Sequence, residues 1–239
     1  MSPDRSWWAR AQNSLKRQER TYVRYACGVH DQLTDALARG LVRPAHDVTL
    51  ETVDVVDHLR GVFPDRGLVR GRIVSCSGDA AVSLALQVVS RATQDGSWLA
   101  VVGVDHLGLV AAREQHVALE RLVVVDPGDG VDEWVSAVGI AVEGFGIVLL
   151  NPPRGLSSRD AKRITTRIQS RRVVAVCVDS PRRIANGQGF VPDVALHTTT
   201  VAWHGIGEGA GHVRSREVCV EVSGRRVARP SRHTLHHVG

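Results

Sequence analysis

GLVRGRIVSCSGDAAVSLALQ, residues 67–87, is the stretch that decides the fold. Its spacing of glycines and apolar residues predicts a strand over residues 72–76, a tight turn at Gly78 and a helix that begins near Asp79. A strand, a short glycine turn and a helix in this order form the layout of a phosphate-binding loop, G-x-x-x-x-G-K-[ST].

The residues that give such a loop its chemistry are absent. Counting from Gly78 places Ser83 at the second glycine, Leu84 at the lysine and Ala85 at the hydroxyl that binds magnesium. An aliphatic side chain can neither neutralise a phosphate nor hold a metal ion. A generic strand-to-helix turn would look the same, so this stretch alone leaves open whether it is a degenerate phosphate loop.

Length and composition indicate a soluble globular class. The 239 residues suit one domain plus an extension. No apolar run approaches the roughly 18 residues that span a bilayer, and the start of the chain lacks the apolar region of a signal peptide, so we expect a cytoplasmic protein. The cysteines form no C-x-x-C pair and are expected to be reduced thiols: Cys27, Cys76, Cys177 and Cys219.

The charge balance is basic, with a net charge of +5 and a pI near 9.5. Arginine supplies most of the positive charge, and its planar guanidinium suits contacts to phosphate or to an acidic protein. The arginine bias of a GC-rich genome would give the same composition. The charge therefore leaves a nucleic-acid partner open.

The first 40 residues predict a helical extension, followed by a linker over residues 41–66. Within residues 6–39 an apolar stripe recurs every seven residues, as in an amphipathic helix. The stripe either packs on its own domain or holds a partner, and aromatic anchors of this kind are over-represented at interface hot spots. The candidate contact residues are Trp7, Trp8, Leu15 and Tyr22.

A regular alternation of strands and helices begins at Gly71 and predicts an α/β fold with a mostly parallel sheet flanked by helices. We expect strands over residues 73–76, 97–104, 122–125, 147–150 and 173–178, and helices over residues 80–92, 109–119, 131–142 and 158–171.

The pattern changes after Cys177. A loop rich in glycine and arginine precedes apparent strands over residues 194–203 and 217–223, and these are separated by the glycine-rich HGIGEGAG segment. Short β runs between turn signals predict an antiparallel extension of the sheet. The core is thus expected to span residues 67–230, with a flexible tail over residues 231–239.

Several segments resemble the ATPase core of RecA-type recombinases. GLVRGRIVSCSG resembles the run that leads into the phosphate loop of that family, and CVEVSGRRVARP resembles its closing hairpin. Residues 147–151 are similar to the strand that ends in the Walker B aspartate, and residues 173–179 to the sensor strand. The resemblance covers roughly residues 60–230 and implies a RecA-like core.

The departures from that family concern the catalytic positions. Asn151 stands where the resemblance places a metal-binding carboxylate, and Asp105 is the one acidic residue in the turn that would activate water. The resemblance therefore implies a degenerate site with no catalytic residue, no cofactor and no metal ion. An enzyme would have to use the few polar residues at strand ends, which are Asp105, His106, Asp126 and Asn151.

Among RecA relatives, the chain most resembles actinobacterial ImuA and ImuA-prime proteins. This resemblance implies an accessory factor of the mutasome, which acts in the SOS response to DNA damage with ImuB and an error-prone C-family polymerase in translesion synthesis, a branch of DNA repair. It would associate with the nucleoid when engaged. The chain is also similar to SulA-type cell-division inhibitors, and a weak DNA-binding RecA paralogue is a further alternative.

Two arginine clusters are candidate contact sites for DNA or a protein partner. Arg163, Arg167 and Arg171 recur every four residues along one predicted helix, where like charges repel by about 0.2–0.5 kcal/mol per pair. A phosphate backbone or an acidic partner would offset that repulsion, although a solvated face tolerates it. Arg182 and Arg183 lie in the loop that the resemblance equates with a DNA-binding loop, so weak contact with a nucleic-acid backbone is expected there.

Overall fold

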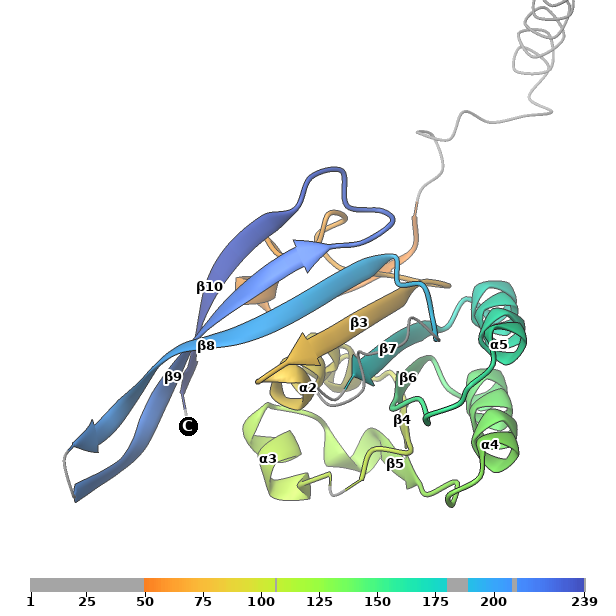
Figure 1. Cartoon of the computed structure of the whole chain (residues 1–239), viewed down its shortest axis with the longest axis horizontal. Helices are drawn as coiled ribbons and strands as arrows, with labels where there is room; N and C mark the ends of the chain where they lie inside the picture. The colour runs from red at the N-terminus through yellow and green to blue at the C-terminus, as the bar shows by residue number, and fades with distance from the viewer. Residues whose placement is uncertain (1–49, 106, 180–188, 208–209, 239) are drawn as a thin grey trace, which may run out of the picture. The chain divides into compact units, whose positions relative to one another are not determined.

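An eight-stranded sheet organises the molecule in the computed structural model, which describes residues 50–105, 107–179, 189–207 and 210–238 (Figure 1). The strand order is β10-β9-β8-β3-β7-β6-β4-β5. The six strands from β8 to β5 run parallel to one another, whereas β9 pairs antiparallel with both β8 and β10. This arrangement confirms the predicted α/β class with its antiparallel C-terminal extension.

The elements follow the predicted alternation closely. The strands of the main sheet are β3 Ile73–Gly78, β4 Leu99–Val102, β5 Leu122–Val125, β6 Ile147–Leu150, β7 Val174–Asp179, β8 Val194–Gly207, β9 Ala210–Ser223 and β10 Ser231–Val238. The α-helices are α2 Ala81–Gln94, α3 Leu109–Glu114, α4 Val131–Gly144 and α5 Ser158–Arg171. Two shorter strands, β1 Thr52–Val53 and β2 Leu68–Val69, pair with each other, and 3-10 turns span Asp57–Leu59 and Leu119–Arg121.

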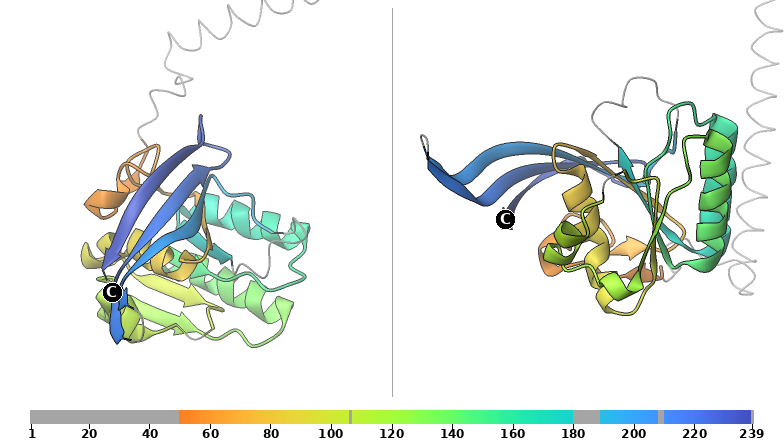
Figure 2. Two further views of the ribbon diagram at one scale, coloured as in Figure 1. Left: turned by 60° about the vertical axis from the view of Figure 1, so that its left-hand side comes forward. Right: turned by 90° about the horizontal axis from the view of Figure 1, so that it is seen from below.

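Helices cover both faces of the parallel part of the sheet (Figure 2). Alternate residues of a strand point to opposite faces, so Leu99 and Val101 join a buried cluster with α2, whereas Ala100 and Val102 join one with α4 and α5. Both faces of β4 are buried, which explains its unbroken apolar run. The core therefore has two layers, one on each side of the sheet.

Local signals set the ends of α5. The Ser157 hydroxyl accepts a hydrogen bond from the backbone nitrogen of Asp160 at 3.1 Å, which caps the first turn. Arg172 ends the helix with a left-handed φ of 56°. These two ends hold the arginines of α5 in a fixed register beside α4.

The structure differs from the sequence-based expectation at three places. The expected linker over residues 41–66 is described only from residue 50, and Val55, Leu59 and Phe63 in that part are buried in the core. The predicted helix over residues 109–119 ends at Glu114, because His116 adopts a φ of 64°. The predicted N-terminal helical extension lies outside the described residues.

The third difference concerns the C-terminal region. Residues 231–238, expected to be a flexible tail, form β10, which pairs with β9 from Ser231↔Val222 to Val238↔Ser215. The sequence shows no core pattern there because an edge strand is held chiefly by backbone hydrogen bonds, and Leu235 is its one buried side chain among those described. Strands β8 and β9 also extend into the glycine-rich segment that was expected to be a turn, so they form one long hairpin.

Candidate functional site

The loop between β3 and α2 stands at the position of a phosphate loop and is only two residues long. Gly78 pairs with Thr198 of β8 and has a φ of 91°. A Cβ at Gly78 would collide with the backbone of Thr198, so glycine is required by this close approach as well as by its φ. The backbone of the loop therefore packs directly against the backbone of β8.

Thr198 ties the loop to β8 through its hydroxyl. The Thr198 Oγ1 atom accepts the N–H of Ala80 at 2.9 Å and donates to the carbonyl of Ser77 at 2.8 Å. The backbone nitrogen of Asp79 also donates to the Thr198 carbonyl at 3.1 Å. Phosphate loops bind their ligand with such backbone N–H groups. Here the N–H groups of residues 79 and 80 are already bonded to β8.

Asp79 adds a negative charge to the same loop. The backbone nitrogen of Thr200 donates to Asp79 Oδ2 at 3.0 Å. This hydrogen bond, followed by one from the Thr200 hydroxyl, holds the pKa of the Asp79 carboxyl below its usual value. An ionised carboxylate beside the loop opposes the approach of a phosphate group.

The other phosphate-loop positions point into the protein. Leu84 and Ala85, at the lysine and hydroxyl positions, are both fully buried in the core beneath α2, and Ser83 is partly exposed. The side chains at the lysine and hydroxyl positions of the pattern are therefore part of the core.

The carboxyl edge between β4 and β6 is filled by an aromatic side chain. Trp134 of α4 is 2% exposed, and a Cβ added at Gly103 would lie 3.0 Å from its ring and 3.3 Å from the carbonyl oxygen of Asn151. Phe190 lies 6.4 Å from the Trp134 ring. Asn151, at the Walker B position, therefore adjoins a packed indole.

The remaining polar candidates at strand ends are dispersed. Asp105 is exposed after β4, and Asp126 is exposed after β5, where its Oδ1 accepts the N–H of Gly128 at 2.9 Å. His106 lies outside the described residues. Among the residues that the structure describes, no group of three or more His, Cys, Asp or Glu side chains could hold a metal ion.

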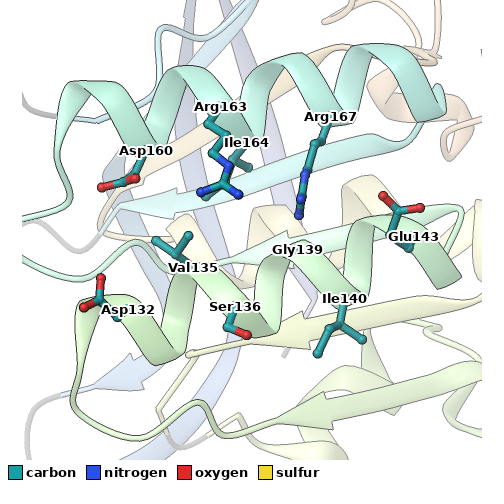
Figure 3. Close-up of a pocket in the computed structure, with 10 residues that line it drawn as sticks. All are labelled: Asp132, Val135, Ser136, Gly139, Ile140, Glu143, Asp160, Arg163, Ile164 and Arg167. Atoms are coloured by element: carbon teal, nitrogen blue, oxygen red, sulfur yellow. The ribbon is translucent and has the colours of Figure 1, made fainter.

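A groove of about 500 Å³ separates α4 from α5 (Figure 3). Arg163 and Arg167 reach from α5 toward α4, so the structure brings two of the three predicted arginines to one groove. Ile140 of α4 lines the same groove and is 71% exposed. Arg171 instead forms an ion pair with Glu143 of α4. The arginine row is therefore partly neutralised by its neighbouring helix.

A feature that the sequence interpretation missed is the outer half of the β8–β9 hairpin, which extends away from the core (Figures 1 and 2). The guanidinium of Arg216 lies 4.6 Å from the ring centroid of Trp203, which is 52% exposed. The sequence shows a tryptophan in one predicted strand and an arginine near the next. Only the register of β8 against β9 places these two residues opposite each other.

The other predicted contact residues cannot be placed. Arg182, Arg183, Trp7, Trp8, Leu15 and Tyr22 lie outside the described residues. Within the described residues, no helix has the length and apolarity needed to cross a bilayer.

Comparisons with known proteins agree with the fold. A family model described as the MT3502 N-terminal domain matches residues 61–182, just over half of the chain. The "Uncharacterized protein Rv3395c" of Mycobacterium tuberculosis (strain ATCC 25618 / H37Rv) is 37% identical over 95 residues, which are 40% of this chain and 42% of that protein. The chain thus matches less than half of the length of this relative.

A solved structure supplies the fold comparison. The flagellar accessory protein FlaH from Methanocaldococcus jannaschii matches with a TM-score of 0.51 at 10% identity, covering 80% of this chain and 100% of that chain. At this identity the likeness shows the fold alone, which is RecA-like.

Proposed function

We propose that this chain, which belongs to the MT3502 N-terminal domain family, is a non-catalytic RecA-like accessory factor that acts through protein contacts in damage-induced mutagenesis. Its proposed partners are an ImuB-type protein and an error-prone C-family polymerase. The proposal combines the RecA-like fold with the sequence resemblance to ImuA and ImuA-prime proteins. Nucleoid association when the chain is engaged with these partners is part of the same proposal.

The observation that carries the non-catalytic part is the closed loop after β3. The Thr198 hydroxyl accepts the N–H of Ala80 and the Thr198 carbonyl accepts the N–H of Asp79, and these are the groups that a phosphate loop would offer to a nucleotide. Leu84 is buried where the phosphate-neutralising lysine would stand. Phosphoryl transfer depends on positioning and charge stabilisation by such groups, so losing them together favours a scaffold role.

The groove between α4 and α5 is the contact surface that best supports a protein partner within this proposal. It combines an exposed aliphatic residue, Ile140, with the guanidinium groups of Arg163 and Arg167. Arginine is enriched at interfaces because it offers planar hydrogen bonding together with an apolar stem. Asp132 and Asp160 line the groove as well, and mixed charges favour a protein surface over a uniform phosphate backbone.

Two experiments test the proposal. Calorimetry with ATP and magnesium should give no binding heat, and micromolar binding would contradict the non-catalytic role. Affinity recovery of the tagged chain from DNA-damaged cells should yield the ImuB-type protein and the polymerase. Recovery should fall in an Arg163→Glu, Arg167→Glu double variant and persist in Arg159→Glu, which changes an arginine of the same helix that does not line the groove.

The outcome of the recovery experiment separates the alternatives. Recovery of the tubulin-like division protein without the polymerase would replace the mutasome role by a SulA-like role. Retention on single-stranded DNA without either protein would favour a weak DNA-binding RecA paralogue.

A further inference from the structure

The outer half of the β8–β9 hairpin extends beyond the core of the protein. Strand β8 pairs with β3 only over residues 194–198, whereas its pairing with β9 continues to Gly207. The part beyond Thr200 therefore extends past the carboxyl end of β3, as Figures 1 and 2 show from different sides. Such an extension contributes little to the core, so core packing does not account for the side chains that it exposes.

Trp203 and Arg216 form an ordered pair on this extension. They are directly opposite each other in the register, and the Arg216 guanidinium lies 4.6 Å from the centroid of the Trp203 ring. Arg216 Nε also donates to the Thr200 hydroxyl at 2.9 Å. Because the guanidinium is already held, a partner would lose little further side-chain freedom in binding the pair. Tryptophan and arginine are the residues most enriched at interface hot spots.

The pair lies on the outward continuation of a buried face. Alternate residues of β9 share a face, so Arg216 lies on the side of Val218 and Val220, both of which are fully buried in the cluster around α2. Trp203, opposite Arg216, shares that side. The sheet face that α2 covers thus continues beyond the core as an uncovered strip.

Further exposed apolar residues lie on the same side and at the same end of the sheet. Helices α2 and α3 begin after the carboxyl ends of β3 and β4 and belong to the same buried cluster as Val218 and Val220. Val82 in the first turn of α2 is 40% exposed, and Leu109 and Val110 at the start of α3 are 51% and 61% exposed. Apolar side chains gathered at one edge mark an interaction surface better than the same residues scattered singly.

The charges on this surface indicate the chemistry of its partner. Arg214 shares the strand with Arg216 and is exposed, whereas Glu217 points to the other face, where its carboxylate lies 3.9 Å from His204. Arg214 and Arg216 therefore place two guanidinium groups beside Trp203, and Arg216 also interacts with the carboxylate of Asp79. A second copy of the chain would bring its own Arg214 and Arg216 against like charges, which disfavours self-association through this strip.

Nucleic acid fits the surface less well than protein does. A single strand is bound by a continuous cationic track with several stacking rings. Here one tryptophan stands among aliphatic residues, Val82, Leu109 and Val110. Aliphatic side chains such as Val82 and Leu109 add nothing to a phosphate contact.

We infer that the strip formed by Trp203, Arg214 and Arg216, together with the exposed apolar residues of α2 and α3, docks an acidic amphipathic segment of a protein partner. The segment would place an apolar side chain against Trp203 and carboxylates against the two guanidinium groups. Docking on the face is favoured over strand addition at the β8 edge, because the irregularities after Thr200 and His204 interrupt that edge. This inference requires a protein partner but stands apart from the mutasome role.

Selection from a displayed library of random short peptides tests the inference with the full chain. The enriched peptides should combine apolar residues with Asp or Glu. Their affinity, measured by fluorescence anisotropy, should fall about tenfold or more in Trp203→Ala and in Arg214→Glu. Trp98→Ala is the matched control, since Trp98 is 47% exposed and has Arg121 at 5.8 Å but precedes β4 at the opposite end of the sheet.

Each contrary outcome overturns the inference. These outcomes are a failure to enrich any peptide, enrichment of basic peptides, and binding that Trp203→Ala leaves unchanged or that Trp98→Ala weakens equally. Binding of labelled oligo-dT that depends on Trp203 while the peptides do not would identify a nucleic-acid surface. A dimer in sedimentation that Trp203→Ala dissociates would identify self-association. Equal thermal midpoints of the variants and the unaltered chain establish that folding is preserved.

Discussion

The hydroxyl of Thr198 lies 2.9 Å from the backbone nitrogen of Ala80 and accepts its N–H. A side chain of β8 thus occupies the N–H group that would donate to a phosphate in a phosphate-binding loop. The two residues are 118 positions apart. The closure of the loop is therefore a property of the tertiary structure rather than of the loop sequence.

Replacing Thr198 with valine should destabilise the protein. The change keeps the side-chain shape but leaves a buried N–H without its acceptor, which costs about 1–3 kcal/mol of unfolding free energy. Urea denaturation measures this loss. Thr199→Val at the next, exposed position should change the unfolding free energy by less than about 0.5 kcal/mol. Equal effects at both positions would show that the bond to Ala80 contributes nothing.

Restoring a lysine at the phosphate-loop position should unfold the protein rather than restore nucleotide binding. Leu84 is fully buried, so Leu84→Lys places an ammonium group in the core, at a cost of several kcal/mol. Val82→Lys, at an exposed position in the first turn of the same helix, is the matched control and should be tolerated. Thermal denaturation compares the two variants, and a stable Leu84→Lys protein that binds ATP would contradict the filled-loop interpretation.

Most of the fold could be predicted from the sequence because the parallel strands are buried on both faces. The apolar run at residues 99–102 and the similar run at residues 147–150 identify central strands without any knowledge of their neighbours. Strand β10 could not be predicted in this way, because the backbone pairing of Ser231–Val238 with β9 leaves little trace in side-chain pattern. Its existence depends on a partner strand that the local sequence does not specify.

Asp79 should make stability depend on pH in the acidic range. Its folded-state pKa is lowered by the Thr200 hydrogen bonds, so the stabilisation is present above the unfolded-state pKa, about 3.8, and is lost as the pH falls through the folded-state value. Asp79→Asn should therefore lower the urea midpoint at neutral pH and converge with the unaltered chain in acid. Parallel pH curves for the two proteins would show that Asp79 does not contribute.

The candidate site was predicted only in part. The loss of the lysine and the hydroxyl is readable directly from Leu84 and Ala85. The periodicity of α5 likewise predicted that its arginines share a face. Two features depend on contacts between distant segments, namely the closure by Thr198 and the pairing of Trp203 with Arg216. Neither can be read from a local pattern, because the register of β8 against its neighbours creates them.

Replacing Gly139 with alanine should not destabilise the protein, although Gly139 is buried in α4. A Cβ added there would lie 2.7 Å from Arg167 Nη1, which is the end of a flexible side chain and can move aside. Glycine in a helix interior costs roughly 0.5–1 kcal/mol relative to alanine. The unfolding free energy of Gly139→Ala should therefore stay equal or rise by up to about 1 kcal/mol.

The control for this change is Gly144→Ala, at the end of the same helix, where a Cβ meets no atom within 4 Å. It should have a smaller effect, because the helix-propensity gain is greatest in a helix interior. Denaturant titration compares the two variants. A loss of stability in Gly139→Ala alone would mean that the Arg167 guanidinium is held firmly over α4. In that case the groove between α4 and α5 is a rigid element of the fold rather than a surface that can adapt to a partner.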